Sequence, residues 1–172
     1  MKRHIVTALV CNKSGVLNRI TGLFSRRGYN IESLSVASTE DDNLSRMTIV
    51  IQGDDYLLEQ IVKQSDKIYD VQRVTELERD NAVMRELLLI KINVLPEQRP
   101  EIETTVRLFK AKTIDISENA MIIELTGEPG KMDGFINLLA PYGIIEMART
   151  GITALERGDR NICDAADYTD II

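Results

Sequence analysis

The 172-residue sequence is short of several residue types, and each shortage excludes something. It has no tryptophan, and aromatic residues make up only 5% of it. A hydrophobic core must therefore be built from isoleucine, leucine and valine. The net charge of −6 argues against a protein that binds nucleic acid or anionic membranes, because both require a basic face. No apolar run approaches the roughly 20 residues of a transmembrane helix, so neither a nucleic acid nor a membrane is an expected partner.

The sequence also lacks the side-chain sets that catalysis requires. His4 is the single histidine and stands at the start of an apolar segment, where we interpret it as an exposed side chain. No second histidine or nearby cysteine completes a zinc site. Two carboxylate pairs, Asp41-Asp42 and Asp54-Asp55, fit a loop and a helix start, since acids are favoured at a helix N-terminus. We predict no catalytic residue, metal site or cofactor-binding motif in this chain.

Cysteine usage and the first residues indicate a cytoplasmic protein. Cys11 and Cys163 form no C-x-x-C pair and suggest no disulfide framework. Basic residues precede an apolar run that ends at Cys11, but no small-x-small cleavage site follows it. We therefore expect a first β-strand there, not a signal peptide, and a reduced, cytoplasmic location.

What the sequence does contain is one pattern of strands and helices that occurs twice. Each copy has the order strand, helix, strand, strand, helix, strand, judged from apolar periodicity and turn residues. The segments are 4–11, 14–28, 31–38, 45–52, 54–62 and 70–77, then 86–95, 96–110, 112–117, 120–126, 127–139 and 144–150. This order is the ferredoxin-like pattern. We predict an α+β protein with two tandem ferredoxin-like βαββαβ domains.

Individual apolar residues also recur between the two copies, as expected for a structural repeat. Leu23, Phe24 and Ile31 correspond to Leu108, Phe109 and Ile116, and Met47, Ile49 and Ile51 correspond to Met121, Ile123 and Leu125. Four polar residues from Glu78 interrupt the periodicity between the copies. We predict a first domain over residues 1–77, a linker over 78–85, a second domain over 86–157 and an acidic, flexible tail over 158–172.

The turn between the first strand and the first helix is the most informative segment. A helix N-terminus presents unpaired N–H groups and partial positive charge, and Gly15 lets a ligand approach that backbone closely. A small carboxylate fits such a place. Asn12 offers a donor and an acceptor to a zwitterion, and Asn30 opens the second strand as a further polar contact. Spacing alone favours a simpler interpretation, in which Ser14 or Asn12 only caps the helix and Gly15 only eases packing.

Several longer strings in the sequence carry a family resemblance. They are Asn12-Lys-Ser-Gly-Val-Leu17, Gly22-Leu-Phe-Ser25, Arg27-Gly-Tyr-Asn-Ile-Glu-Ser-Leu34, Leu44-Ser-Arg-Met-Thr-Ile49 and Ala148-Arg-Thr-Gly-Ile152. Together with shorter matches between them, these strings resemble the small, regulatory subunits of acetolactate synthase (acetohydroxyacid synthase). The resemblance covers residues 3–158, and only the tail has no counterpart.

The resemblance implies that the first domain is an ACT domain, an amino-acid-sensing βαββαβ module, followed by a second ferredoxin-like domain. It also implies a homodimer in which ACT domains pair edge to edge and bind a branched-chain amino acid, usually valine, at their interface. The family's effector positions match Asn12, Gly15 and Asn30. Neighbouring candidates for the same effector site are Ser14, Val16, Leu17 and Ile31.

On this resemblance the chain is a regulatory subunit without an active site. It is expected to bind and activate the catalytic subunit, which makes acetolactate and CO₂ from pyruvate in branched-chain amino acid biosynthesis, and to confer feedback inhibition by valine. Thiamine diphosphate, Mg²⁺ and FAD are expected on that catalytic partner. One alternative is a free-standing ACT module that regulates another enzyme or a transcription factor. An acylphosphatase-type hydrolase would need an arginine in the first turn, where Lys13 stands.

Overall fold

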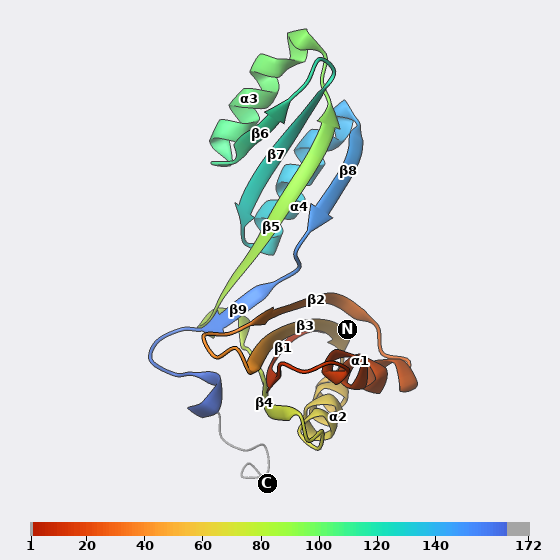
Figure 1. Cartoon of the computed structure of the whole chain (residues 1–172). Helices are drawn as coiled ribbons and strands as arrows, with labels where there is room; N and C mark the ends of the chain where they lie inside the picture. The colour runs from red at the N-terminus through yellow and green to blue at the C-terminus, as the bar shows by residue number, and fades with distance from the viewer. Residues whose placement is uncertain (1, 165–172) are drawn as a thin grey trace. The chain divides into compact units, whose positions relative to one another are not determined.

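Figure 1 shows the computed structural model, which describes residues 2–164. The chain divides into two compact units: one holds the residues up to Val83 and those from Ile152 onward, and the other is Met84–Gly151. Among the described residues, no helix has the length and apolar character needed to cross a membrane.

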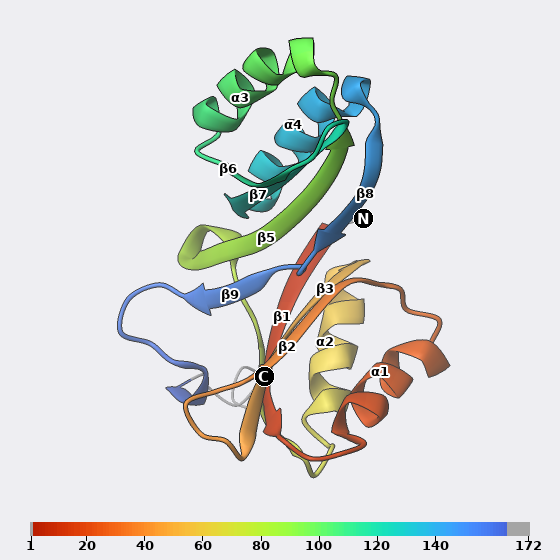
Figure 2. The same ribbon diagram turned by 45° about the horizontal axis from the view of Figure 1, so that its top comes forward.

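The first unit is a four-stranded antiparallel sheet with two helices on one face (Figure 2). Its elements are β1 (Lys2–Cys11), α1 (Val16–Arg26), β2 (Ile31–Ser38), β3 (Leu44–Gly53), α2 (Asp55–Ser65) and β4 (Val71–Glu76), with strand order β2-β3-β1-β4. Alternate residues of β1 and β3, among them Val6 and Ile49, form the core beneath the helices. Asp54 caps α2 by accepting a hydrogen bond of 2.8 Å from the Leu57 N–H, as its position predicts.

The second unit repeats this architecture. Its elements are β5 (Ala82–Asn93), α3 (Arg99–Leu108), β6 (Lys112–Ile116), β7 (Ala120–Gly127), α4 (Pro129–Leu139) and β8 (Ile144–Arg149), with strand order β6-β7-β5-β8. Ile90 and Phe135 are among its fully buried core residues. The predicted α+β fold with two ferredoxin-like βαββαβ repeats is therefore confirmed.

The structure differs from the predicted boundaries at the end of the chain. We predicted that the second domain runs to residue 157 and that a flexible tail begins at 158. Instead β9 (Thr153–Glu156), which pairs with β5, and the short 3₁₀ helix η4 (Ile162–Asp164) belong to the first unit. The backbone of Ile152 bonds both Ser35 Oγ, at 2.7 Å, and Ser33 Oγ, at 3.2 Å. Residues 165–172 of the predicted tail lie outside the described residues.

Packing on the uncovered face of the first sheet explains this difference. The side chains of Ser33, Ser35 and Ile5 lie on the face of the sheet opposite the helices. Ile5 is nevertheless buried, and so are Ile152 and Ile162 of the returning segment. In the predicted linker, a 3₁₀ turn (Arg79–Asn81) leads directly into β5 at residue 82.

The interpretation of His4 as an exposed side chain is also wrong, because this side chain is fully buried. It is aligned with Ile51 of β3 and points to the helix-covered face of the sheet. Its Nδ1 is 2.8 Å from Oε1 of Glu76, which satisfies that ring nitrogen without solvent. A histidine at a strand start was a poor guide to exposure because α2 covers that end of the strand.

Candidate functional site

The turn that joins β1 to α1 leaves the N-terminus of α1 without a side-chain cap. Gly15 is the N-cap residue and adopts φ 85° and ψ −12°, in the left-handed region that glycine enters without cost. Within the described chain no side chain, Ser14 and Asn12 included, bonds to this helix end. The interpretation that one of these two residues only caps the helix is therefore wrong. The N–H of Val16 donates to the carbonyl of Lys13 at 3.4 Å, so the N–H groups of Leu17 and Asn18 are the ones left for an anion.

Asn12 instead holds a neighbouring loop in place. Its backbone N–H donates to the carbonyl of Asn43 at 2.7 Å, and its Nδ2 donates to the carbonyl of Asp42 at 2.9 Å. These bonds attach the β2–β3 hairpin loop to the turn beside Gly15. One of the two amide hydrogens of Asn12 is thus used within the protein. The side chain is oriented by this bond and remains exposed to solvent.

The four neighbouring candidates for the effector site differ in how exposed they are to solvent. Val16 is buried in the core and supports the turn from beneath, whereas the Leu17 side chain is 45% exposed beside the helix N-terminus. Ser14 is exposed, and Ile31 is half-buried against the core. Leu17 is therefore the candidate with an apolar surface that a bound molecule can contact at this end of α1.

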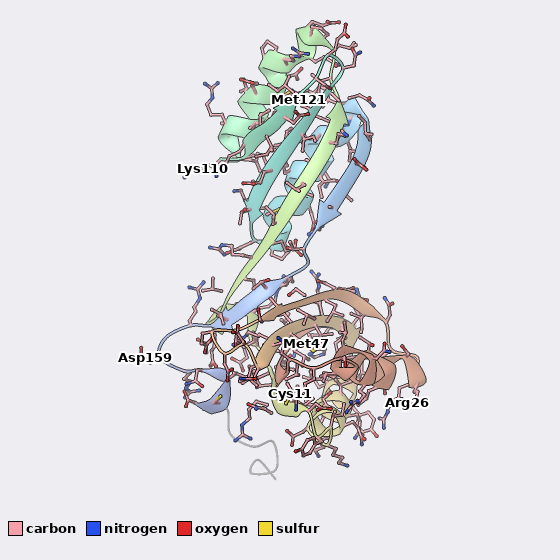
Figure 3. The ribbon with its side chains drawn as sticks, in the orientation of Figure 1. Cys11, Arg26, Met47, Lys110, Met121 and Asp159 are labelled. Carbon is pink, nitrogen blue, oxygen red and sulfur yellow. The ribbon has the colours of Figure 1, made fainter. Side chains whose placement is uncertain are left out.

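Asn30 lies far from Asn12 and Gly15 in the same chain. It directly precedes β2, whose first residue, Ile31, is aligned through β3 with His4 near the start of β1. The turn follows the other end of β1, and the 11 residues of α1 separate the two places by about 16 Å. In Figure 3, Cys11 before the turn and Arg26 at the far end of α1 lie well apart. One chain therefore does not bring the three predicted residues together.

A cation that sequence reasoning missed stands next to Gly15. The guanidinium of Arg19 would lie 3.8 Å from a Cβ atom placed on Gly15. It forms an ion pair with Asp70, whose side chain is only 7% exposed. The backbone carbonyl of Asp70 also accepts from the N–H of Cys11 at 2.8 Å. The ion pair holds the Arg19 guanidinium beside the helix end, where its remaining N–H groups can donate to a carboxylate.

Comparison with known proteins assigns both halves of the chain to the same family of proteins. A family profile described as "AHAS small subunit-like ACT domain" matches residues 6–73, and one described as "Small subunit of acetolactate synthase" matches residues 85–158. The first match, together with the sheet order and the two helices on one face, defines the first unit as an ACT domain. The chain belongs to the family of acetolactate synthase small subunits.

Individual relatives agree with this assignment. The acetolactate synthase small subunit of Bacillus subtilis is 48% identical over 160 residues, which cover 92% of each chain. That of Mycolicibacterium smegmatis is 46% identical over 159 residues, covering 92% of this chain and 94% of the relative. The crystal structure of the small subunit from Thermotoga maritima superposes with a TM-score of 0.86 at 42% identity, covering 93% of this chain and all of that one.

Proposed function

We propose that this chain binds the catalytic subunit of an acetolactate synthase in the cytoplasm, raises its activity and makes it sensitive to valine. Family membership supports the partner, and two free cysteines suit a reducing compartment. Thiamine diphosphate, Mg²⁺ and FAD are assigned to the catalytic chain in this proposal. The regulated reaction is the formation of acetolactate in branched-chain amino acid biosynthesis.

The observation that carries the proposal is the separation of Asn30 from the turn at Gly15. Strand β2 is an edge of the sheet and can pair with another strand. If the β2 strands of two copies pair antiparallel about a two-fold axis, the start of one lies beside the end of the other. The end of β2, Ser38, is aligned through β3 with Val10, close to the turn. Asn30 of the second copy would thus approach Gly15 of the first.

A valine in this shared site would be recognised by complementary chemistry. Its carboxylate would accept hydrogen bonds from the free N–H groups of α1, with the Arg19 charge nearby. Its ammonium group would donate to the side-chain oxygens of Asn12 and of Asn30 from the second copy. Leu17 would contact the apolar side chain. Because the ligand bridges two chains, its binding is coupled to the dimer geometry, typically by about 1–3 kcal/mol.

The function is tested by purifying the chain together with an acetolactate synthase catalytic subunit and measuring acetolactate formation with and without valine. We expect a stable complex, a higher rate than that of the catalytic subunit alone, and loss of that rate gain when valine is added. Failure to bind or to raise the rate would contradict the proposal. Valine binding to the chain in the absence of any effect on the catalytic subunit would favour a free-standing ACT module.

A further inference from the structure

A cavity of about 270 Å³ lies within the first unit, on the sheet face opposite α1 and α2. Its floor includes Thr7, Thr75 and Arg46, which alternate along their strands with the core residues beneath the helices. Its other wall is the returning segment, including Leu155, Arg160 and Ile162. The cavity is therefore distinct from the turn at Gly15, and it is slightly smaller than the 300–1,000 Å³ typical of drug-sized ligands.

Arg46 in this cavity has an unmet hydrogen-bonding requirement. Its Nε is buried and has no hydrogen-bond acceptor among the described residues. Burial lowers the pKa of the guanidinium, and the charge of nearby Glu40 opposes that shift only in part. A half-buried guanidinium carries five donors in a planar fork that matches a carboxylate. The Nε is itself inaccessible to a ligand, so an incoming carboxylate would pair with the terminal guanidinium nitrogens, for which the described residues provide no hydrogen-bond acceptor.

The other residues that line the cavity indicate which further groups the ligand would have. The hydroxyls of Thr7 and Thr75 donate to backbone carbonyls, at 3.2 and 3.3 Å, so neither has a proton left for a carboxylate, and Glu156 also lines the cavity; Arg46 is therefore the group that would hold the acceptor. Leu77 and Ile162 are buried and Leu155 is exposed, which gives an apolar lining on one side. A ligand with a charged end and a short apolar body would match both sides of the cavity.

We propose that this cavity binds a small organic carboxylate, with its carboxylate group on Arg46 and its apolar body against Leu77 and Ile162. This site is separate from the proposed valine site and does not depend on the regulatory function. It lies where the returning segment closes over the sheet, so an occupant would hold residues 155–162 against β1 and β4.

The probe for this site is isovalerate, a branched five-carbon carboxylate, and the control ligand is isovaleramide, which has the same shape without the charge. Both are titrated by isothermal calorimetry into the Gly15→Asp chain, in which the proposed valine site, which would also accept a branched carboxylate, is blocked. We expect saturable binding of isovalerate and binding of isovaleramide that is about tenfold weaker, because charge-assisted hydrogen bonds are roughly twice as strong as neutral ones. Equal affinity for the two ligands, or no saturable binding of isovalerate, would overturn the proposal.

Variants locate the binding. Arg46→Gln should abolish isovalerate binding, whereas Arg26→Gln, which removes the same charge from an exposed position on α1, should leave it unchanged. A matched pair at Leu155, which is 55% exposed, avoids any risk to the fold. Leu155→Glu should weaken isovalerate binding and Leu155→Lys should strengthen it. Binding that survives in Arg46→Gln, or that does not move in opposite directions in the Leu155 pair, would contradict this site.

Discussion

At the residue scale, Gly15 determines the backbone conformation of the turn and which charged groups can approach it. Its positive φ would cost an L-residue roughly 1–2 kcal/mol. A side chain at this position would extend toward the Arg19 guanidinium, 3.8 Å from the Cβ position. An acidic side chain would therefore pair with the charge, and occupy the space, that we assign to the carboxylate of valine.

We predict that Gly15→Asp abolishes valine binding while the protein stays folded. Gly15→Ala introduces the same backbone strain without the charge, so it should retain most of the affinity. Isothermal titration of both variants with valine, alongside circular dichroism, separates the two effects. Equal loss in both variants would mean that backbone strain, and not the carboxylate site, is responsible.

Gly130→Asp serves as the charge control for this comparison. It adds the same carboxylate in the second unit, where a Cβ atom meets nothing within 4 Å. Its valine affinity should equal that of the wild-type chain. Unchanged affinity in Gly15→Asp itself would contradict the assignment of the site to this turn.

How much of this site the sequence could predict varies from residue to residue. The strand-to-helix turn and its glycine were predictable, because local spacing places them at a helix N-terminus. The contact between Arg19 and Asp70 was not, because it joins residues 51 positions apart and depends on where β4 begins. The bond from Asn12 to the hairpin loop was also unpredictable, since it depends on how two loops meet.

At the element scale, the two repeats were predictable because each helix and strand shows its own apolar period. The returning segment was not, because β9 has only four residues and is too short to show a period. Its apolar residues, such as Ile162, are isolated among polar ones. This segment is ordered by the pairing of β9 with β5 and by the burial of Ile152 and Ile162, and both depend on contacts that exist only in the folded protein.

We predict that Ile162→Ala destabilises the first unit by about 2 kcal/mol, at the low end for a buried isoleucine, because its site lies near the surface. Hydrogen exchange of the β1 amides measures this local stability. Ile116→Ala, at a position 51% exposed in the second unit, should leave those amides unchanged. Equal protection in the wild-type chain and Ile162→Ala would show that residues 158–164 do not pack on this sheet.

At the scale of the whole molecule, we propose that the three predicted effector residues become one site only when two copies meet. Within one chain, α1 holds Asn30 at one end and Gly15 at the other. No pattern in a single sequence reveals this separation, because it follows from the order of strands in the sheet. A shared site explains how a molecule as small as valine can alter an assembly: its contacts depend on how two subunits are placed.

The most direct test of this shared site is complementation between two defective chains. Gly15→Asp and Asn30→Ala homodimers should each fail to bind valine. After co-refolding in equal amounts, half of the dimers are mixed, and each mixed dimer has one intact site. Calorimetry should then recover about one quarter of the wild-type number of valine sites. No recovery, although mixed dimers are present, would show that each site is built within one chain and would contradict the account.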